Sequence, residues 1–396
     1  MVKIPNFEVE QWMDTYETTP GVLNIAETCC SSISLTELEG FRSSPGTAKP
    51  LLDPSTRMTY GAIRGSEELR RNIAATYDAY GTTVSTENIL VTQGAIAANH
   101  LVFYSLVGPG DHVVCVFPTY QQLYEIPKSL GAEVSLLNLE EKDGYVPSIE
   151  KLEGLIKENT KMIVINNPNN PTGATTPLSI LKNIVSLAQK HDIILMADEV
   201  YSPLYHSLPE DQIPPSCLSL DYEKVVATSS MSKAWALAGI RLGWVASHSP
   251  ELIATLVKTR DYTTISVSQL DDAVARFALS DEVRPNLLAR NKELAKTNLA
   301  LLERFVQEHR GVVEWVKPTA GTTAFVKFLK DGKPVSDVHF CKDVLEKTKG
   351  MFVPGELCFG HGMAFQGFVR IGYVSETEVL KEALQRLGVY VKENLG

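Results

Sequence analysis

Short apolar runs alternate with amphipathic stretches through the middle of this chain. Residues 88–92 predict a strand, and the run from Gly94 through residue 107 predicts the helix that follows it. Repeated strand–helix units of this kind indicate a mainly parallel sheet covered on both faces, and hence an α/β fold. Further strands are expected at 111–117, 161–166, 193–197, 224–228 and 242–246.

The pattern changes around Pro250. Long helical stretches are expected at about 251–279 and 284–309, followed by strands near 312–315, 323–327 and 368–373 and by a last helix at 376–394. This order is typical of a smaller α+β domain, against which the first 45 residues are expected to pack. We therefore predict a large domain over 46–280 and a small domain formed by 1–45 and 281–396.

Composition excludes several classes of protein. The 396 residues carry a formal net charge of -10 and no basic cluster, which argues against a nucleic-acid surface. No cysteine or histidine set has zinc spacing, so no metal is expected, and no apolar run has the length of a signal peptide core or a membrane span. Six scattered cysteines, two of them adjacent, predict reduced thiols in a cytoplasmic protein.

Lys233 stands behind the small-residue run Ser229–Ser232, and Arg241 follows eight positions later. This arrangement is typical of enzymes that use pyridoxal 5'-phosphate (PLP), because a lysine amine condenses with the cofactor aldehyde and an arginine binds its phosphate. Asp198 ends an apolar strand, where ligand crevices form in α/β sheets. The junction around Gly94 offers backbone N–H groups at a helix start, which suit an anion.

These motifs, with the loop 166–173, resemble the class I/II aminotransferases of PLP fold type I over nearly the whole chain. The resemblance implies a seven-stranded, mainly parallel sheet and a homodimer with a shared active site. It also implies an internal aldimine at Lys233, with Asp198 at the pyridine nitrogen and Tyr201 as the third catalytic residue. The remaining implied cofactor ligands are Gly94, Ala95, Ile96, Ser230 and Arg241 at the phosphate, Tyr201 and Asn170 at the phenolic oxygen, Tyr120 on the ring, and Tyr60 reaching the neighbouring subunit's phosphate.

Arg370, in the stretch 368–373, matches the family's arginine for the substrate carboxylate, and Asn170 is expected beside it. The chain departs from the family where a Gly-x-Pro-Asp-like element is common, since residues 23–32 read LNIAETCCSS. Residues 7–12, 260–264 and 320–325 resemble a divergent branch with capreomycidine synthase and the PLP-dependent arginine oxidases. Glu27 could then pair with a cationic substrate side chain or act on a β or γ proton; the alternative is a solvated loop residue.

The leading hypothesis is an aminotransferase that acts on an L-amino acid and a keto acid. The second is a PLP-dependent cyclase, lyase or oxidase of an arginine-like amino acid, because the residues that build the carbanion do not choose its fate. A non-catalytic regulator of the same fold would need a basic DNA-binding segment, which the sequence lacks, and would not need Lys233.

Overall fold

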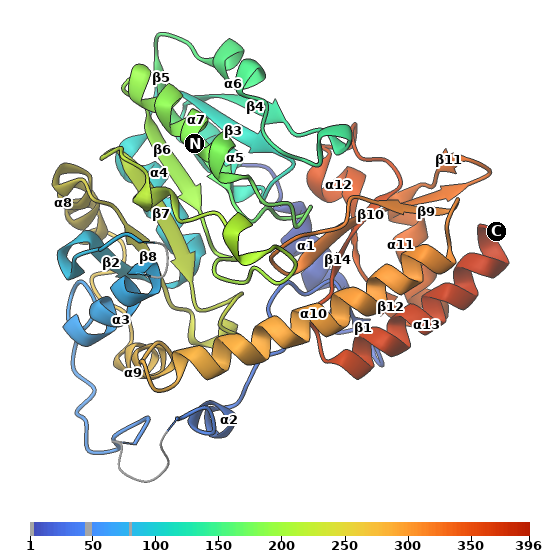
Figure 1. Ribbon diagram of the computed structural model, residues 1–396, viewed down its shortest axis with the longest axis horizontal. Coiled ribbons are helices and arrows are strands. Elements are labelled where there is room, and N and C mark those ends of the chain that lie inside the picture. The colour runs from blue at the N-terminus through green and yellow to red at the C-terminus, as the bar shows by residue number, and fades with distance from the viewer. Residues whose placement is uncertain (1–3, 44–49, 79–80) are drawn as a thin grey trace.

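The computed structural model describes residues 4–43, 50–78 and 81–396 (Figure 1). Its large sheet has seven strands in the order β2-β8-β7-β6-β5-β3-β4. The pairings among β7, β6, β5, β3 and β4 are parallel, whereas β8 runs antiparallel to both β7 and β2. The strand bounds are β2 Ile89–Thr92, β3 His112–Phe117, β4 Glu133–Asn138, β5 Thr160–Asn166, β6 Ile194–Asp198, β7 Val225–Ser230 and β8 Gly243–Ala246.

Successive residues of these strands enter two different apolar cores. Ile163 and Ile165 of β5 pack on one side of the sheet, while Met162 and Val164 pack on the other. This two-residue period places helices over both faces, because both faces are apolar. The helices of this part are α3 Glu67–Asp78, α4 Gly94–Leu106, α5 Gln122–Ser129, α6 Ile149–Leu155, α7 Leu178–Lys190, α8 Pro250–Arg260 and α9 Gln269–Ala278.

A smaller sheet lies beside the large one, with the order β11-β10-β14-β13 and β9 paired to β10. The long helix α10 runs from the side of the large sheet to this smaller unit, where it packs against α13 (Figure 1). The bounds are β9 Val313–Trp315, β10 Thr323–Lys330, β11 Lys333–Pro334, β13 Val353–Pro354, β14 Phe368–Gly372, α10 Arg284–Glu308, α11 Asp337–Thr348, α12 Gly355–Phe359 and α13 Thr377–Asn394.

The N-terminal segment joins the smaller unit. Helix α1 (Glu8–Tyr16) packs on it through Trp12, whose Nε1 donates to the Phe352 carbonyl at 3.0 Å. Strand β1 (Leu23–Asn24) pairs in parallel with β12 (Gly350–Met351), and α2 (Leu35–Glu39) follows. The predicted domain boundary at 45/46 lies outside the described residues and the one at 280/281 falls between α9 and α10, so the division itself stays a prediction.

One expectation was wrong in detail, and one strand of the large sheet was missed. The helix expected at 251–279 is two helices, because Arg260 ends α8 with a buried guanidinium that donates to backbone carbonyls, including Val91 at 2.9 Å. Strand β4 was not anticipated, since its exposed and half-buried residues at the sheet edge lack a continuous apolar run. Among the described residues, no helix is long and apolar enough to cross a lipid bilayer.

Candidate active site

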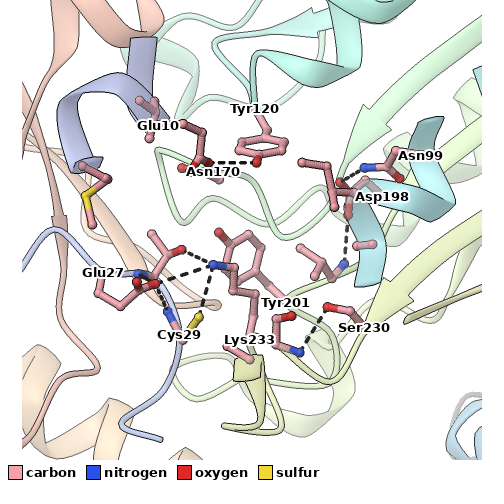
Figure 2. A pocket seen from close by; sticks show the side chains of 18 of the residues that line it. Glu10, Glu27, Cys29, Asn99, Tyr120, Asn170, Asp198, Tyr201, Ser230 and Lys233 are labelled. Atoms are coloured by element: carbon pink, nitrogen blue, oxygen red, sulfur yellow. Dashed lines mark hydrogen bonds and ion pairs between the residues drawn. The ribbon is translucent and has the colours of Figure 1, made fainter. Parts of the chain in front are cut away.

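A cavity of about 610 Å³ opens at the carboxyl ends of β5, β6 and β7. These strands end at Asn166, Asp198 and Ser230, so that their last polar side chains face the same space. The opposite wall comes from α1, the loop after β1, and Arg370 of β14. The lining side chains include Glu10, Glu27, Tyr120, Asn170, Asp198, Tyr201, Ser230 and Lys233, which are drawn in Figure 2.

Asp198 lies at the centre of the sheet edge and is 3% exposed. Its carboxylate accepts hydrogen bonds from the Asn99 side-chain amide at 3.1 Å and from the Val200 N–H at 3.1 Å. Burial raises the pKa of Asp198 to about 6, although these two donors lower it. The Thr228 hydroxyl donates to Asn99 Oδ1 at 2.6 Å, which turns the amide N–H groups toward Asp198.

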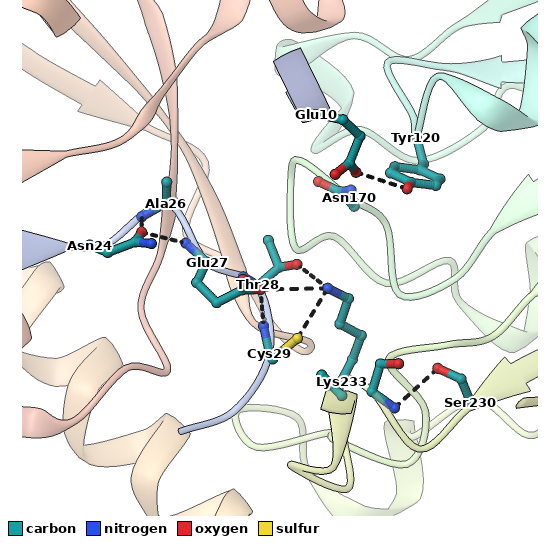
Figure 3. A network of polar contacts seen from close by, with 12 residues as sticks. Glu10, Asn24, Ala26, Glu27, Thr28, Cys29, Tyr120, Asn170, Ser230 and Lys233 are labelled. Carbon is teal, nitrogen blue, oxygen red and sulfur yellow. Dashed lines mark hydrogen bonds and ion pairs between the residues drawn. The ribbon is translucent and has the colours of Figure 1, made fainter. Parts of the chain in front are cut away.

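Lys233 reaches into the cavity from the turn after β7 (Figure 3). Its Nζ lies 2.6 Å from Thr28 Oγ1, 3.4 Å from Cys29 Sγ and 3.7 Å from Glu27 Oε1. Burial lowers the pKa of Lys233, but Cys29, Glu27, Tyr201 and Tyr120 raise it above its usual value. Because burial raises the pKa of the Cys29 thiol to about 11, the thiol is neutral at pH 7, and Glu27 is the anion that stabilises the ammonium group.

Glu27 is held by the backbone of its own loop. Its Oε1 accepts the N–H groups of Thr28 at 2.6 Å and Cys29 at 2.9 Å. Burial raises the pKa of Glu27, but Lys233 and these N–H groups outweigh it and lower the pKa to about 2. Glu27 is therefore an anion held beside the lysine by its own loop, with a side chain that is 46% exposed.

The start of α4 forms an anion-binding corner. Gly94 has φ +80°, and a Cβ built on it would lie 3.0 Å from Arg241 Nη2. Gly243 of β8 packs so closely that its Cβ would lie 2.5 Å from the Gly94 carbonyl carbon. The first-turn N–H groups of Ala95 and Ile96 have no partner within the helix, and the cavity is lined here by both residues and by Arg241. Ser230 and Ser232 complete this corner, with the Ser230 hydroxyl accepting the Ser232 N–H at 3.2 Å.

Arg370 of β14 also lines the cavity and is 3% exposed. Its Nη2 donates to the Ala26 carbonyl at 2.9 Å and its Nη1 to Asn170 Oδ1 at 3.4 Å. Its Nε has no hydrogen-bond partner within the described part of the chain. A buried guanidinium with donor capacity left over suits a carboxylate ligand.

Tyr120 forms part of the cavity roof. Its hydroxyl donates to Glu10 Oε1 of α1 at 3.1 Å, and its ring centroid lies 4.9 Å from that of Phe7. The N-terminal segment therefore covers the outer side of this ring.

The family model for aminotransferase class I and II matches residues 38–387. The chain belongs to this family. An aspartate aminotransferase of Pyrococcus horikoshii is 30% identical over 330 residues, covering 83% of this chain and 82% of the relative. The capreomycidine synthase of Streptomyces vinaceus is 29% identical over 336 residues, covering 85% and 80%. The crystal structure of a PLP-dependent aminotransferase from Streptococcus suis matches with a TM-score of 0.88 and 37% identity, covering 99% of this chain and 98% of that one.

The chain is therefore a PLP-dependent transaminase, of a family that uses amino acids and keto acids as substrates. The predicted family, PLP fold type I and PLP cofactor are confirmed. The residues present fit this cofactor: a cationic, N–H-rich corner matches a phosphate, and a buried carboxylate held by amide donors matches a protonated ring nitrogen. Gly243 packs so closely against the start of α4 that no side chain fits between them, so this corner presents backbone groups.

The structure brings most of the predicted aminotransferase site into one cavity. Gly94 does not itself line the cavity, but it lies against Arg241 at this corner. Tyr60 lies outside the cavity and is 81% exposed. Asn99, Thr28 and Cys29 were missed, as were the side chains of α1. The predicted residues that line the cavity are Glu27, Ala95, Ile96, Tyr120, Asn170, Asp198, Tyr201, Ser230, Lys233, Arg241 and Arg370.

Proposed function

We propose that this aminotransferase takes the amino group from an L-amino acid bound between Arg370 and Lys233, with Lys233, Asp198 and Tyr201 as its catalytic residues. The observation that carries the proposal is that one cavity is lined by a half-buried lysine amine, a buried carboxylate and a buried arginine. These are the groups needed to move a proton, to polarise a cofactor ring and to fix a carboxylate.

Ala95, Ile96, Ser230 and Arg241 would hold the phosphate of PLP through N–H, hydroxyl and guanidinium donors. Tyr120 would cover a face of its ring, and Asn170 and Tyr201 would donate to its phenolic oxygen. Bound PLP supplies an aldehyde carbon that exchanges the amino group and a ring that accepts electrons from the substrate α-carbon.

The protein's own groups would then act at named atoms. Asp198, ionised and held by Asn99, would face the ring nitrogen and favour its protonated form. The forked donors of Arg370 would bind the substrate α-carboxylate and set the orientation of the α-carbon. The Lys233 amine, once free and neutral, would accept the α-proton at Nζ and give it up again.

A second candidate is supported by the charges of the cavity wall. Glu10, Asp14, Glu17 and Glu27 line it, and the described lining holds only three lysine or arginine residues, each with a proposed role at the cofactor or the α-carboxylate. This surplus of carboxylates favours a cationic substrate side chain over an acidic one. It fits the cyclase, lyase or oxidase hypothesis for an arginine-like amino acid, as does the similarity to capreomycidine synthase.

The deciding experiment treats the PLP-loaded protein with single L-amino acids, without a keto acid, and identifies the products by mass spectrometry. Transamination predicts conversion of the cofactor to its amine form with one equivalent of keto acid, and borohydride reduction of the starting enzyme should leave the cofactor on Lys233. Turnover of arginine or ornithine with the aldehyde form retained would support the second candidate. The Lys233→Ala variant is the control for both results.

We further propose a homodimer with a shared site. Support comes from exposed apolar side chains on two adjacent segments: Tyr60 and Tyr262 are 81% and 85% exposed, and Gln269 Nε2 donates to the Thr59 carbonyl at 2.5 Å. Light scattering should give twice the chain mass. Mixing inactive Lys233→Ala with impaired Tyr60→Ala should restore activity, because a hybrid dimer then contains one intact site.

A cytoplasmic location is also proposed. All six cysteines are free thiols and buried, which suits a reducing compartment. Cell fractionation with a tagged chain tests this, and recovery in a secreted fraction would contradict it.

A further inference from the structure

The loop after β1 is held by hydrogen bonds to its own Asn24 side chain and to the backbone of β14 and the residues after it. Asn24 Oδ1 accepts the N–H groups of Ala26 at 3.0 Å and Glu27 at 3.2 Å, which folds the chain into a tight turn. The Gly372 N–H donates to the Ile25 carbonyl at 2.7 Å, and the Ser31 N–H donates to the Val374 carbonyl at 2.7 Å. The positions of this loop's side chains are therefore set by its hydrogen bonds to β14 and the residues that follow it.

This loop places Thr28 beside the amine of Lys233. Thr28 is 5% exposed, and its hydroxyl oxygen lies 2.6 Å from Lys233 Nζ, the shortest of the amine's three contacts (Figure 3). A hydroxyl can both accept and donate, so it can bond a charged or a neutral amine. Glu27, as a carboxylate, can only accept, and it lies 3.7 Å away.

We propose that Thr28 is a positioning residue for Lys233, which holds the amine toward the substrate α-carbon while the amine loses and regains its proton. This inference rests on the proposed transamination, in which the α C–H bond breaks, its electron pair stays on carbon and the proton forms an N–H bond on Nζ. The Thr28 oxygen accepts from the ammonium form after that transfer. Before it, the Thr28 O–H can donate to the lone pair of the neutral amine without moving the loop.

The kinetic test compares Thr28→Val with Thr28→Ser in the PLP-loaded enzyme. Thr28→Val should slow conversion of the cofactor by about 10- to 100-fold with little change in KM for the amino donor, whereas Thr28→Ser should stay within about threefold. With an α-deuterated donor, the isotope effect should rise in Thr28→Val, because proton transfer becomes more rate-limiting. Thr28→Ala removes the same hydroxyl without added bulk and serves if Thr28→Val does not fold.

Thr348→Val is the matched control. Thr348 is also buried, its hydroxyl donates to the Val344 carbonyl at 2.7 Å, and neither residue lines the cavity. This variant should lose stability as a buried hydroxyl is lost, yet keep the wild-type isotope effect. An unchanged rate and isotope effect in both Thr28→Val and Thr28→Ala would overturn the proposal.

A second readout does not depend on catalysis. In the cofactor-free protein, trace acetylation of Lys233 followed by mass spectrometry reports the pH at which its amine becomes neutral. Thr28→Val should shift this titration to lower pH, since the ammonium loses its nearest acceptor, and Thr28→Ser should not. Failure of wild-type enzyme to convert its cofactor with any amino acid would contradict the proposed function, whereas normal conversion with no Thr28 effect would contradict only this inference.

Discussion

The carboxylate of Asp198 accepts a hydrogen bond from the side-chain amide of Asn99 at 3.1 Å, at the end of the middle strand of the large sheet. Burial alone would favour the neutral acid, so this donor helps to keep the carboxylate ionised. The Asn99–Asp198 pair links α4 to β6, and thus links the proposed phosphate corner to the proposed ring-nitrogen partner.

Asn99→Leu should raise the pKa of Asp198 above its value of about 6. The proposed role requires the ionised carboxylate, so the acid limb of kcat/KM should move to higher pH while the alkaline limb stays in place. A pH profile with a saturating keto acid measures this shift. Asn298→Leu, a buried asparagine that donates to the Ser375 carbonyl, is the control; an identical shift there would mean that the effect is not local.

Arg370→Lys should lower kcat/KM for the amino donor by roughly 100-fold, because an ammonium group cannot reproduce the forked donors that bind a carboxylate. Binding of PLP should change little, since Arg370 bonds to Ala26 and Asn170 and not to the residues of the α4 corner. Steady-state kinetics and a cofactor titration separate the two effects. Equal kcat/KM in variant and wild type would show that the substrate carboxylate binds elsewhere.

Gly243→Ala should weaken cofactor binding by about tenfold or more. The added Cβ would lie 2.5 Å from the Gly94 carbonyl carbon and 2.6 Å from the Ala95 nitrogen, which forces the first turn of α4 to move. Equilibrium dialysis of PLP measures the loss. Gly108→Ala, where a Cβ meets nothing within 4 Å, should bind PLP as the wild type does.

Gly372→Ala should destabilise the fold by about 2 to 3 kcal/mol, because its Cβ would lie 1.8 Å from the Glu27 carbonyl oxygen. The loop that carries Thr28 must then move, so activity should fall further than stability predicts. Gly154→Ala in α6, where the Cβ has open space, should instead gain about 0.5 to 1 kcal/mol. Thermal unfolding and the cofactor conversion rate test both statements. A Gly372→Ala protein as active and stable as wild type would refute the first, and a Gly154→Ala protein less stable than wild type would refute the second.

The sheet and the cofactor motifs could be predicted because their signals are local. Apolar runs define β5, β6 and β7, and the positions of Asp198, at the end of β6, and Lys233, just after β7, follow from these strand ends. Asn99 carried a weaker signal, as one of three polar residues, with His100 and Ser105, in the mostly apolar helix α4. The break at Arg260 could not be predicted, because it depends on carbonyl groups far away in sequence.

The wall formed by the first thirty residues was harder to anticipate. The acidic residues of α1 have the appearance of an ordinary solvated helix face, and nothing near Thr28 in sequence indicates a lysine partner. Thr28 contacts Lys233, which is 205 residues away in sequence, and Ala26 contacts Arg370, which is 344 residues away. Such contacts follow from the pairing of β1 with β12 and from the packing of the loop on β14, which only the three-dimensional structure shows.

That long-range closure sets an order of events during synthesis. The corner between Gly94 and Arg241 belongs to chain that leaves the ribosome before β14 exists. The loop carrying Glu27 and Thr28, made before that corner, has no strand to lie against until Gly372 has emerged. A nascent chain can therefore assemble the phosphate corner first, while the wall that faces the lysine amine is completed only after β14 has left the ribosome.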